Sequence, residues 1–437
     1  SAHVEKTSAK APTAPTVSTL AKAILANNEI KTPITTPGKE ISAYTKDDVK
    51  NATESVSTSD QAYYITYGTG WEASGDKFNL TGTAVTSDTY ANSYSSLVGK
   101  YLVSEFIYGA GSSTAGTMKT TTNLSSVCYV VSATQNSLTY KKIRSNKNVT
   151  EALLASTPDD YGTSYYFRGA VKNNYVEFAN KCWRIVRVSG DGSVKLILHN
   201  DNTTKVANPC DSVNNSDTAA FARYSGTTYE SSFIENLGDN AYVGFKYGTP
   251  GSSTYEATHA NTNNSLILNN LETWYNNNLK KYEKVIADTV WCNDKSVSSG
   301  LGYANDITCY GATQRLVSSS GSAGGTGPSL KCNGELSKIT SKVGLITADE
   351  LAYAGYAAEL YNTTPYLQEN AADYWWSLSP FDFNGRDADV WTADGYSGSF
   401  TFFYVDSPRA VRPSISLVSS TTVSSGSGTS EDPYIIK

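Results

Sequence analysis

The chain has 437 residues, of which 39% are hydrophobic and only 17% are charged. This length suffices for about two to three domains with sizeable cores, and the composition excludes a chain that is disordered throughout. Lys and Arg (35) against Asp and Glu (41) leave a net charge of −6. We therefore expect no nucleic-acid partner, and the evenly mixed charges offer no polybasic patch for a membrane surface.

No run of about 18 apolar residues is present, so neither a transmembrane helix nor membrane insertion is expected. The chain begins at Ser1, and its one Met is Met118. We expect a mature exported chain, extracellular or on a cell surface, with no C-terminal anchor motif after Lys437.

The even number of Cys residues indicates disulfide bonds and an oxidising compartment. None of them forms a C-x-x-C pair, and only three His are present, so no zinc site is expected. Six separate thiols are the alternative. The residues are Cys128, Cys182, Cys210, Cys292, Cys309 and Cys332.

Residues 1–45 are expected to form an arm or linker. Residues 7–18 are rich in Ala, Pro and Thr and lack periodicity, 19–25 allow two helical turns, and 30–39 hold two Pro and one Gly. An ordered arm needs a surface to pack on, and a neighbouring chain is one candidate.

Residues 46–145 are expected to form a small β-rich domain, because Thr, Tyr and Val dominate their apolar runs. The candidate strands are 62–67, 77–85, 101–104, 127–131 and 137–143.

Residues 146–437 follow an α+β pattern. A helix is predicted over 265–279, with Ser265 as its N-cap. A second helix is predicted to begin at Thr347, where Thr347 and Glu350 form a capping box, and to end at Gly355. A short helix is also predicted over 149–156. Strands are predicted over 175–178, 182–188 and 194–198, the last two joined by a hairpin turn at 189–192.

Segments of this region carry a family resemblance. They are YFRG (166–169) with NNYV (173–176), CWRIVR (182–187), WCNDK (291–295), GLITADELAYAG (344–355), and YWWSLSP (374–380) leading to VRP (411–413). Together they resemble a large family of exported proteins of gut Firmicutes and their relatives. The C-terminal domain of that family is similar to the C-type-lectin-like fold of formylglycine-generating-enzyme relatives and retroelement-diversified binding proteins.

The resemblance covers about residues 150–437, and a weaker resemblance extends over residues 46–145. It implies an α+β fold with a C-type-lectin-like domain (146–437), preceded by the small β-rich domain and the arm. Formylglycine-generating enzymes depend on a Cys pair in this part, and this chain has no Cys after Cys332. That chemistry is therefore not expected.

The same resemblance implies two disulfides. In that family WCND (here 291–294) and PSLKC (here 328–332) occur together, which implies Cys292–Cys332. Cys182–Cys210 follows in the same way, and Cys128–Cys309 would then link the two domains.

No catalytic or cofactor-binding residue is predicted. His3, His199 and His259 accompany no G-x-S-x-G elbow. Asp387 and Asp389 share a strand face and could act as a glycosidase pair, although solvated acids are the simpler interpretation. No cofactor is expected, and a structural calcium is left open without assigned ligands.

The aromatic run at 381–406 is the candidate ligand-binding face. If Ala388 and Val390 point inward, Trp391 and its acidic neighbours point outward, and an inward Phe403 leaves Phe402 outward. Exposed aromatic rings beside polar groups suit recognition, although packing under loops is the alternative. The candidate residues are Phe381, Asp382, Phe383, Asn384, Arg386, Asp387, Asp389, Trp391, Tyr396, Phe402, Tyr404 and Asp406.

We therefore expect a non-enzymatic, adhesin-like binding protein that recognises a glycan or a protein through this face. The alternative is a structural subunit of an extracellular filament or sheath that self-assembles through the N-terminal arm, by strand addition to a neighbour. The low charge and the Ser-, Thr-, Asn- and Tyr-rich composition suit that alternative.

Overall fold

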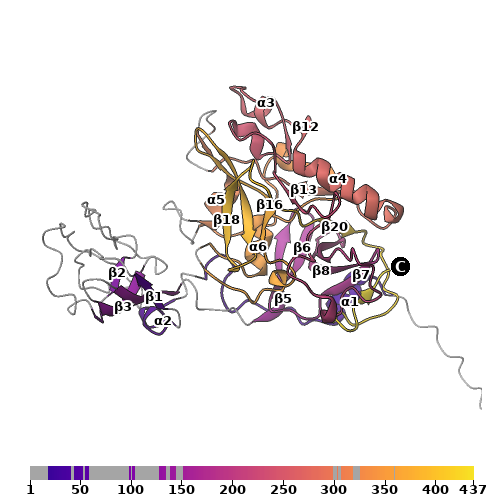
Figure 1. Ribbon diagram of the computed structural model, residues 1–437. Helices are drawn as coiled ribbons and strands as arrows, with labels where there is room; N and C mark the ends of the chain where they lie inside the picture. The colour runs from indigo at the N-terminus through magenta and orange to yellow at the C-terminus, as the bar shows by residue number, and fades with distance from the viewer. Residues whose placement is uncertain are drawn as a thin grey trace, which may run out of the picture.

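The computed structural model of the chain describes residues 18–40, 44–52, 55–58, 98–99, 101–103, 127–133, 138–143, 151–298, 303, 307–317, 325–358 and 360–437. The chain is an α+β protein rich in strands and with few, mostly short helices, as the sequence predicted (Figure 1).

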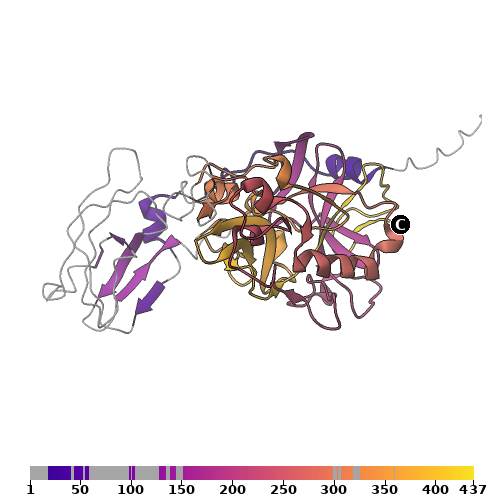
Figure 2. The same cartoon turned by 90° about the horizontal axis from the view of Figure 1, so that it is seen from above.

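A small antiparallel sheet lies to one side of a larger body in both views (Figures 1 and 2). Helix α2 (Lys46–Lys50) contacts β3 and begins with a capping box between Thr45 and Asp48. The predicted strands at 62–67 and 77–85 lie outside the described residues. The other three are confirmed over 101–103, 127–131 and 138–141. The sheet order is β1–β4–β3–β2, with β1 (Ser55–Thr58), β2 (Tyr101–Val103), β3 (Val127–Ala133) and β4 (Leu138–Lys141).

The first sheet of the large body has the order β20–β9–β8–β6–β5, and β7 pairs with both β8 and β21. The predicted hairpin is confirmed as β8 and β9, whose apolar side chains, such as Trp183 and Leu196, are fully buried. The strands are β5 (Ala152–Asp159), β6 (Gly162–Gly169), β7 (Tyr175–Phe178), β8 (Lys181–Val188), β9 (Val194–Asn200), β20 (Ser414–Leu417) and β21 (Tyr434–Ile435).

The short helix predicted over 149–156 is wrong, because residues 152–156 of this segment lie in strand β5. Its Ala and Leu residues favour a helix locally. However, β5 pairs with β6 along its whole length, from Ala152 opposite Gly169 to Asp159 opposite Gly162. Pairing with a partner strand therefore overrides the local preference.

The second sheet has the order β10–β19–β16–β17–β18, with β14 paired to β16, so β18 is an edge strand. Helix α6 (Ala348–Ala354) contacts β6 of the first sheet and β16 and β17 of the second, and all seven of its residues are buried. Its predicted capping box and its C-cap, Gly355, are confirmed. The strands are β10 (Glu230–Ser231), β14 (Thr308–Cys309), β16 (Tyr374–Phe383), β17 (Ala388–Asp394), β18 (Phe400–Tyr404) and β19 (Arg409–Ala410).

Helix α4 (Leu266–Asn278) covers one side of the body and confirms the helix predicted over 265–279. Ser265 caps it by accepting a hydrogen bond from the Leu268 amide, and the helix buries its own Trp274 side chain against the body. The remaining elements are α3 (Tyr255–His259), α5 (Gly311–Leu316), β11 (Lys246–Tyr247), β12 (Asn263–Asn264), β13 (Thr289–Cys292), β15 (Lys338–Ser341) and the 3₁₀ turns η6 (Ser212–Asn214), η7 (Asn240–Val243), η8 (Lys280–Tyr282), η9 (Glu335–Ser337) and η10 (Tyr366–Gln368).

Residues 18–40 of the arm pack on the large body of the same chain. Helix α1 (Leu20–Ala26) buries Leu20 and Ile24 completely. The Lys31 amide donates to the Leu154 carbonyl of edge strand β5 at 2.8 Å. Further along, Glu40 forms a 2.8 Å ion pair with the fully buried Arg168. The arm therefore contributes apolar and charged groups to a core that also contains residues from the far end of the chain.

Candidate functional site

The predicted face lies on two consecutive hairpins, β16–β17 and β17–β18, and its residues differ widely in exposure. Trp391 lies opposite Phe402, and Asp389 opposite Tyr404. The exposed residues are Asn384, Arg386, Tyr396, Phe402 and Tyr404; the half-buried ones are Phe381, Asp382 and Asp406; the buried ones are Phe383, Asp387, Asp389 and Trp391.

The expectation that Asp387, Asp389 and Trp391 point outward is wrong. Strand β17 lies between β16 and β18, and it also contacts α6 and η7, so residues 388–393 are all buried. Alternation does hold on edge strand β18, where Phe402 and Tyr404 are 41% and 44% exposed. One-sided exposure requires an uncovered face, which β17 lacks.

Several of these side chains line an open groove of about 270 Å³, here called the aromatic groove. The Phe381 and Phe402 rings stack in parallel, with centroids 4.2 Å apart. Trp391 meets the Phe381 ring edge-on at 4.8 Å. Besides Val317 and Ala358, the groove is lined by Tyr361, Tyr374, Phe381, Trp391, Asp394, Ser399, Phe400, Thr401 and Phe402.

The aromatic groove is held in shape by hydrogen bonds to its own walls. The Trp391 indole donates to the Thr313 hydroxyl of α5 at 3.1 Å, and that hydroxyl donates to the Phe381 carbonyl at 2.9 Å. Asp394 accepts from the amides of Tyr396 and Ser397, which shapes the β17–β18 turn. These bonds fix the Trp391 indole, the backbone at Phe381 and the turn that follows β17.

Two carboxyls lie close together beneath this surface, and the pair is Asp382 and Asp389 rather than Asp387 and Asp389. They face each other across β16 and β17, and one oxygen of each is buried without a described hydrogen-bond partner. Burial, together with the carboxyl of Asp382, raises the pKa of Asp389 to about 8. Asp389 is therefore largely protonated at neutral pH.

Neither described His is set up as a general base near neutral pH. Burial lowers the pKa of His259 to about 3 and that of His199 well below its ordinary value. Nε2 of His259 lies 3.1 Å from the Tyr310 hydroxyl, and Nε2 of His199 lies 3.2 Å from the Asn370 amide.

Within the described part of the chain, no three His, Cys, Asp or Glu side chains gather closely enough to hold a metal ion. Among the described helices, none combines the length and apolar character needed to cross a membrane.

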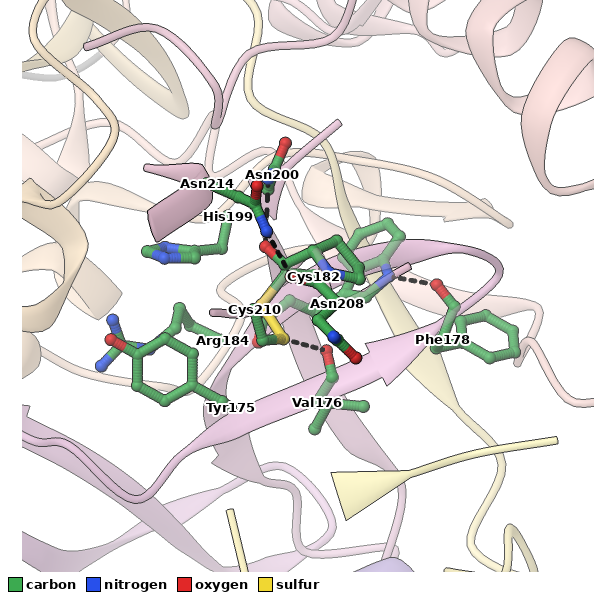
Figure 3. Close-up of a disulfide and its surroundings, with 12 residues drawn as sticks. Tyr175, Val176, Phe178, Cys182, Arg184, His199, Asn200, Asn208, Cys210 and Asn214 are labelled. Carbon is green, nitrogen blue, oxygen red and sulfur yellow. Dashed lines mark hydrogen bonds between the residues drawn. A yellow bond between two sulfur atoms is a disulfide. The ribbon is translucent and has the colours of Figure 1, made fainter. Parts of the chain in front are cut away.

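The structure contains the two disulfides implied by the resemblance, Cys182–Cys210 and Cys292–Cys332. Figure 3 shows the first, where the Cys210 sulfur also lies 3.5 Å from the Val176 carbonyl oxygen. The predicted Cys128–Cys309 disulfide is wrong. Cys128 is buried in the small sheet, whereas Cys309 lies on β14 of the large body, opposite Asp382 of β16.

A second concave site was not singled out from the sequence. It is an open pocket of about 1020 Å³ beside the Cys182–Cys210 disulfide, here called the basic pocket. Its one sequence signal is the polar run 276–281, NNNLKK, because the rest of its wall comes from three separate segments. Its charged residues are Glu177, Lys181, Asp201, Lys205, Arg223, Lys280 and Lys281.

Comparisons of the chain with protein-family models, with curated proteins and with solved structures each gave no match.

Proposed function

We propose that the chain is an extracellular, non-enzymatic binding protein whose C-terminal part has a C-type-lectin-like fold and whose aromatic groove holds a glycan. The observation that carries the proposal is the Phe381–Phe402 stack, which leaves Phe402 41% exposed at the groove. Large apolar side chains are normally buried, so an exposed ring fixed by stacking suits a ligand contact.

The chemistry of the groove fits a sugar ring. Flat aromatic faces offer apolar area to the C–H faces of a sugar, while the hydroxyl of the half-buried Thr401 offers hydrogen bonds. A volume of about 270 Å³ suits one or two sugar units. Two disulfides are compatible with the extracellular location.

The test is a glycan array followed by calorimetry with the best ligand, using Phe402→Ala and a matched control, Tyr404→Ala. Both side chains are exposed on β18, but only Phe402 lines the groove. We expect Phe402→Ala to weaken binding about tenfold or more, and Tyr404→Ala to leave it within about twofold. Equal losses in both variants, or no glycan bound by the intact chain, would reject this function.

One observation favours the alternative, a filament or sheath subunit. Ile30 forms a parallel bridge with Leu154 at the edge of the first sheet, so the arm adds to this sheet as an extra strand would. The same contact made by the arm of a second copy would link subunits by strand exchange.

Light scattering after size exclusion, with negative-stain imaging of the intact chain, tests this alternative. A monomer at all concentrations would reject it, whereas polymers would support it. Variants must keep residues 18–40, because their removal would uncover the core that packs on Leu20 and Ile24.

A further inference from the structure

Residues with a left-handed backbone conformation are concentrated in the frame of the basic pocket. Of the five non-glycine residues with positive φ in the described part, four line this pocket: Ala179, Asn180, Asn202 and Lys205. Each such conformation costs about 1–3 kcal/mol for most residue types and is kept where surrounding contacts enforce it, commonly at functional sites.

Specific contacts hold this frame in place. Ala179 and Asn180 form the two-residue turn between β7 and β8, a position that requires positive φ at both residues. The Asn202 side chain donates to the carbonyls of Asn180 and Val206, at 2.7 and 3.1 Å, and so ties this turn to the loop that follows β9. The Cys182–Cys210 disulfide fixes the far end of that loop (Figure 3).

The pocket carries an excess of positive charge on a chain whose net charge is −6. Five basic and two acidic residues line it. Lys181 is neutralised by Asp201 at 2.7 Å, and outside the pocket wall Glu283 pairs with Lys280 at 2.9 Å.

The remaining cations, Lys205, Arg223 and Lys281, make no ion pair in the described part of the chain. Arg223 is held instead by the carbonyl oxygens of Thr218 and Phe221. Asp201 also acts on the Arg223 guanidinium, but this carboxylate is already paired with Lys181. The three cations together therefore keep an excess of positive charge, which favours a ligand that brings negative charge.

From these contacts we propose that the basic pocket binds an acidic oligosaccharide, with Lys205, Arg223 and Lys281 facing its anionic groups. The exposed amides of Asn180, Asn276 and Asn277 supply both donors and acceptors for sugar hydroxyls. A volume of about 1020 Å³ accommodates two or three sugar units. The site is separate from the aromatic groove and does not depend on the function proposed for it.

Calorimetry on the intact chain tests this site with three probes: trigalacturonate, a sulfated disaccharide and neutral maltotriose. The variant is Lys205→Asn with Lys281→Gln, because Asn tolerates the left-handed conformation of Lys205 (φ 56°) while removing its charge. Lys284→Gln is the matched control, since Lys284 is exposed three residues beyond Lys281 and does not line the pocket.

We expect at least one acidic probe to bind more tightly than maltotriose, and its affinity to fall as salt rises. The double variant should lose about tenfold or more in affinity, while Lys284→Gln stays within about twofold. Preference for the uronate identifies carboxylates as the recognised group, and preference for the sulfated probe identifies sulfate. No preference over maltotriose, an unaffected double variant, or an equal loss in Lys284→Gln would overturn the proposal.

Discussion

Asp389 keeps its proton into the neutral range because its carboxyl is buried beside that of Asp382. The two lie opposite each other on β16 and β17, and Cys309 lies opposite Asp382 on the other side. Burial and the nearby Asp382 carboxyl in turn raise the pKa of the Cys309 thiol. No described cation forms an ion pair with Asp382 or Asp389, although Arg386 pairs with the neighbouring Asp387. A second negative charge in this cluster is therefore costly.

This arrangement predicts a pH-dependent stability. Because folding raises the pKa of Asp389 from 3.8 to about 8, the native chain binds this proton more tightly than the unfolded chain does. The resulting stabilisation is complete below about pH 4 and is lost as the pH rises through 8. The Asn side chain of Asp389→Asn stays neutral at every pH. The effect of this substitution on the free energy of unfolding should therefore be about 1–3 kcal/mol more stabilising at pH 9 than at pH 5.

Urea unfolding of the intact chain and the variant at pH 5, 7 and 9 measures this change. Asp288→Asn, at an exposed position, serves as the control and should show no such trend. An effect of Asp389→Asn that is equal at all three pH values would contradict the prediction.

Side-chain direction was predictable from sequence only where a strand has one covered face. The period of two places Phe402 and Tyr404 outward on β18, and both are exposed. The same rule fails for Asp387 and Trp391, because the covering elements α6 and η7 come from distant parts of the chain. Likewise, Asp389 meets Asp382 through a register shift between β16 and β17 that no local pattern reveals.

At the scale of elements, segments with their own end signals were predictable. Ser265 and Thr347 cap α4 and α6 through their own side chains, so the helix starts are encoded locally. Residues 152–159 carry no such signal, and pairing with β6 determines that they form a strand. The docking of α1 is also non-local, since the Leu20 amide donates to the carbonyl of Thr421, about 400 residues further on.

The docked arm leads to a prediction for α1. Ile24 is fully buried, so Ile24→Ala removes apolar contacts and leaves a cavity. We expect the free energy of unfolding to fall by about 2–5 kcal/mol. Lys22→Ala, on the exposed side of the same helix, should change it by less than about 0.5 kcal/mol.

Chemical denaturation of both variants, monitored by Trp fluorescence, measures this difference. Equal and small effects would contradict the docking of α1 on its own chain. They would instead favour an arm whose partner is another copy.

At the scale of the whole molecule, the arm and the large body form one folded unit that the small sheet interrupts in sequence. Glu40 and Glu151 both pair with Arg168, at 2.8 and 2.7 Å, one from before the small sheet and one from after it. The chain therefore returns to the same buried guanidinium after completing the small sheet. A buried Arg that lost one of these partners would carry uncompensated charge, which makes the arm part of the fold rather than an appendage.

The two disulfides are expected to contribute similar stability but to have different local effects. They close loops with sequence separations of 28 and 40 residues, so removal of either by a double Cys→Ala change should cost about 3–4 kcal/mol. Of the two disulfides, only Cys182–Cys210 anchors the loop of residues 201–209 at the basic pocket, together with side-chain hydrogen bonds from Asn200, Asn202 and Asn214. Removing that disulfide should therefore also speed amide hydrogen exchange in residues 201–209.

Denaturant unfolding and hydrogen exchange on the two double variants separate these effects. The Cys292/Cys332 variant is the control for a global loss of stability, because its loop lies away from this pocket. If exchange in residues 201–209 rises equally in both variants, the loop responds only to overall stability and the disulfide does not shape the pocket. If exchange in residues 201–209 rises only in the Cys182/Cys210 variant, the affinity of that variant for acidic oligosaccharides should also fall. The reason is that the positions of Lys205 and Asn202 would no longer be fixed.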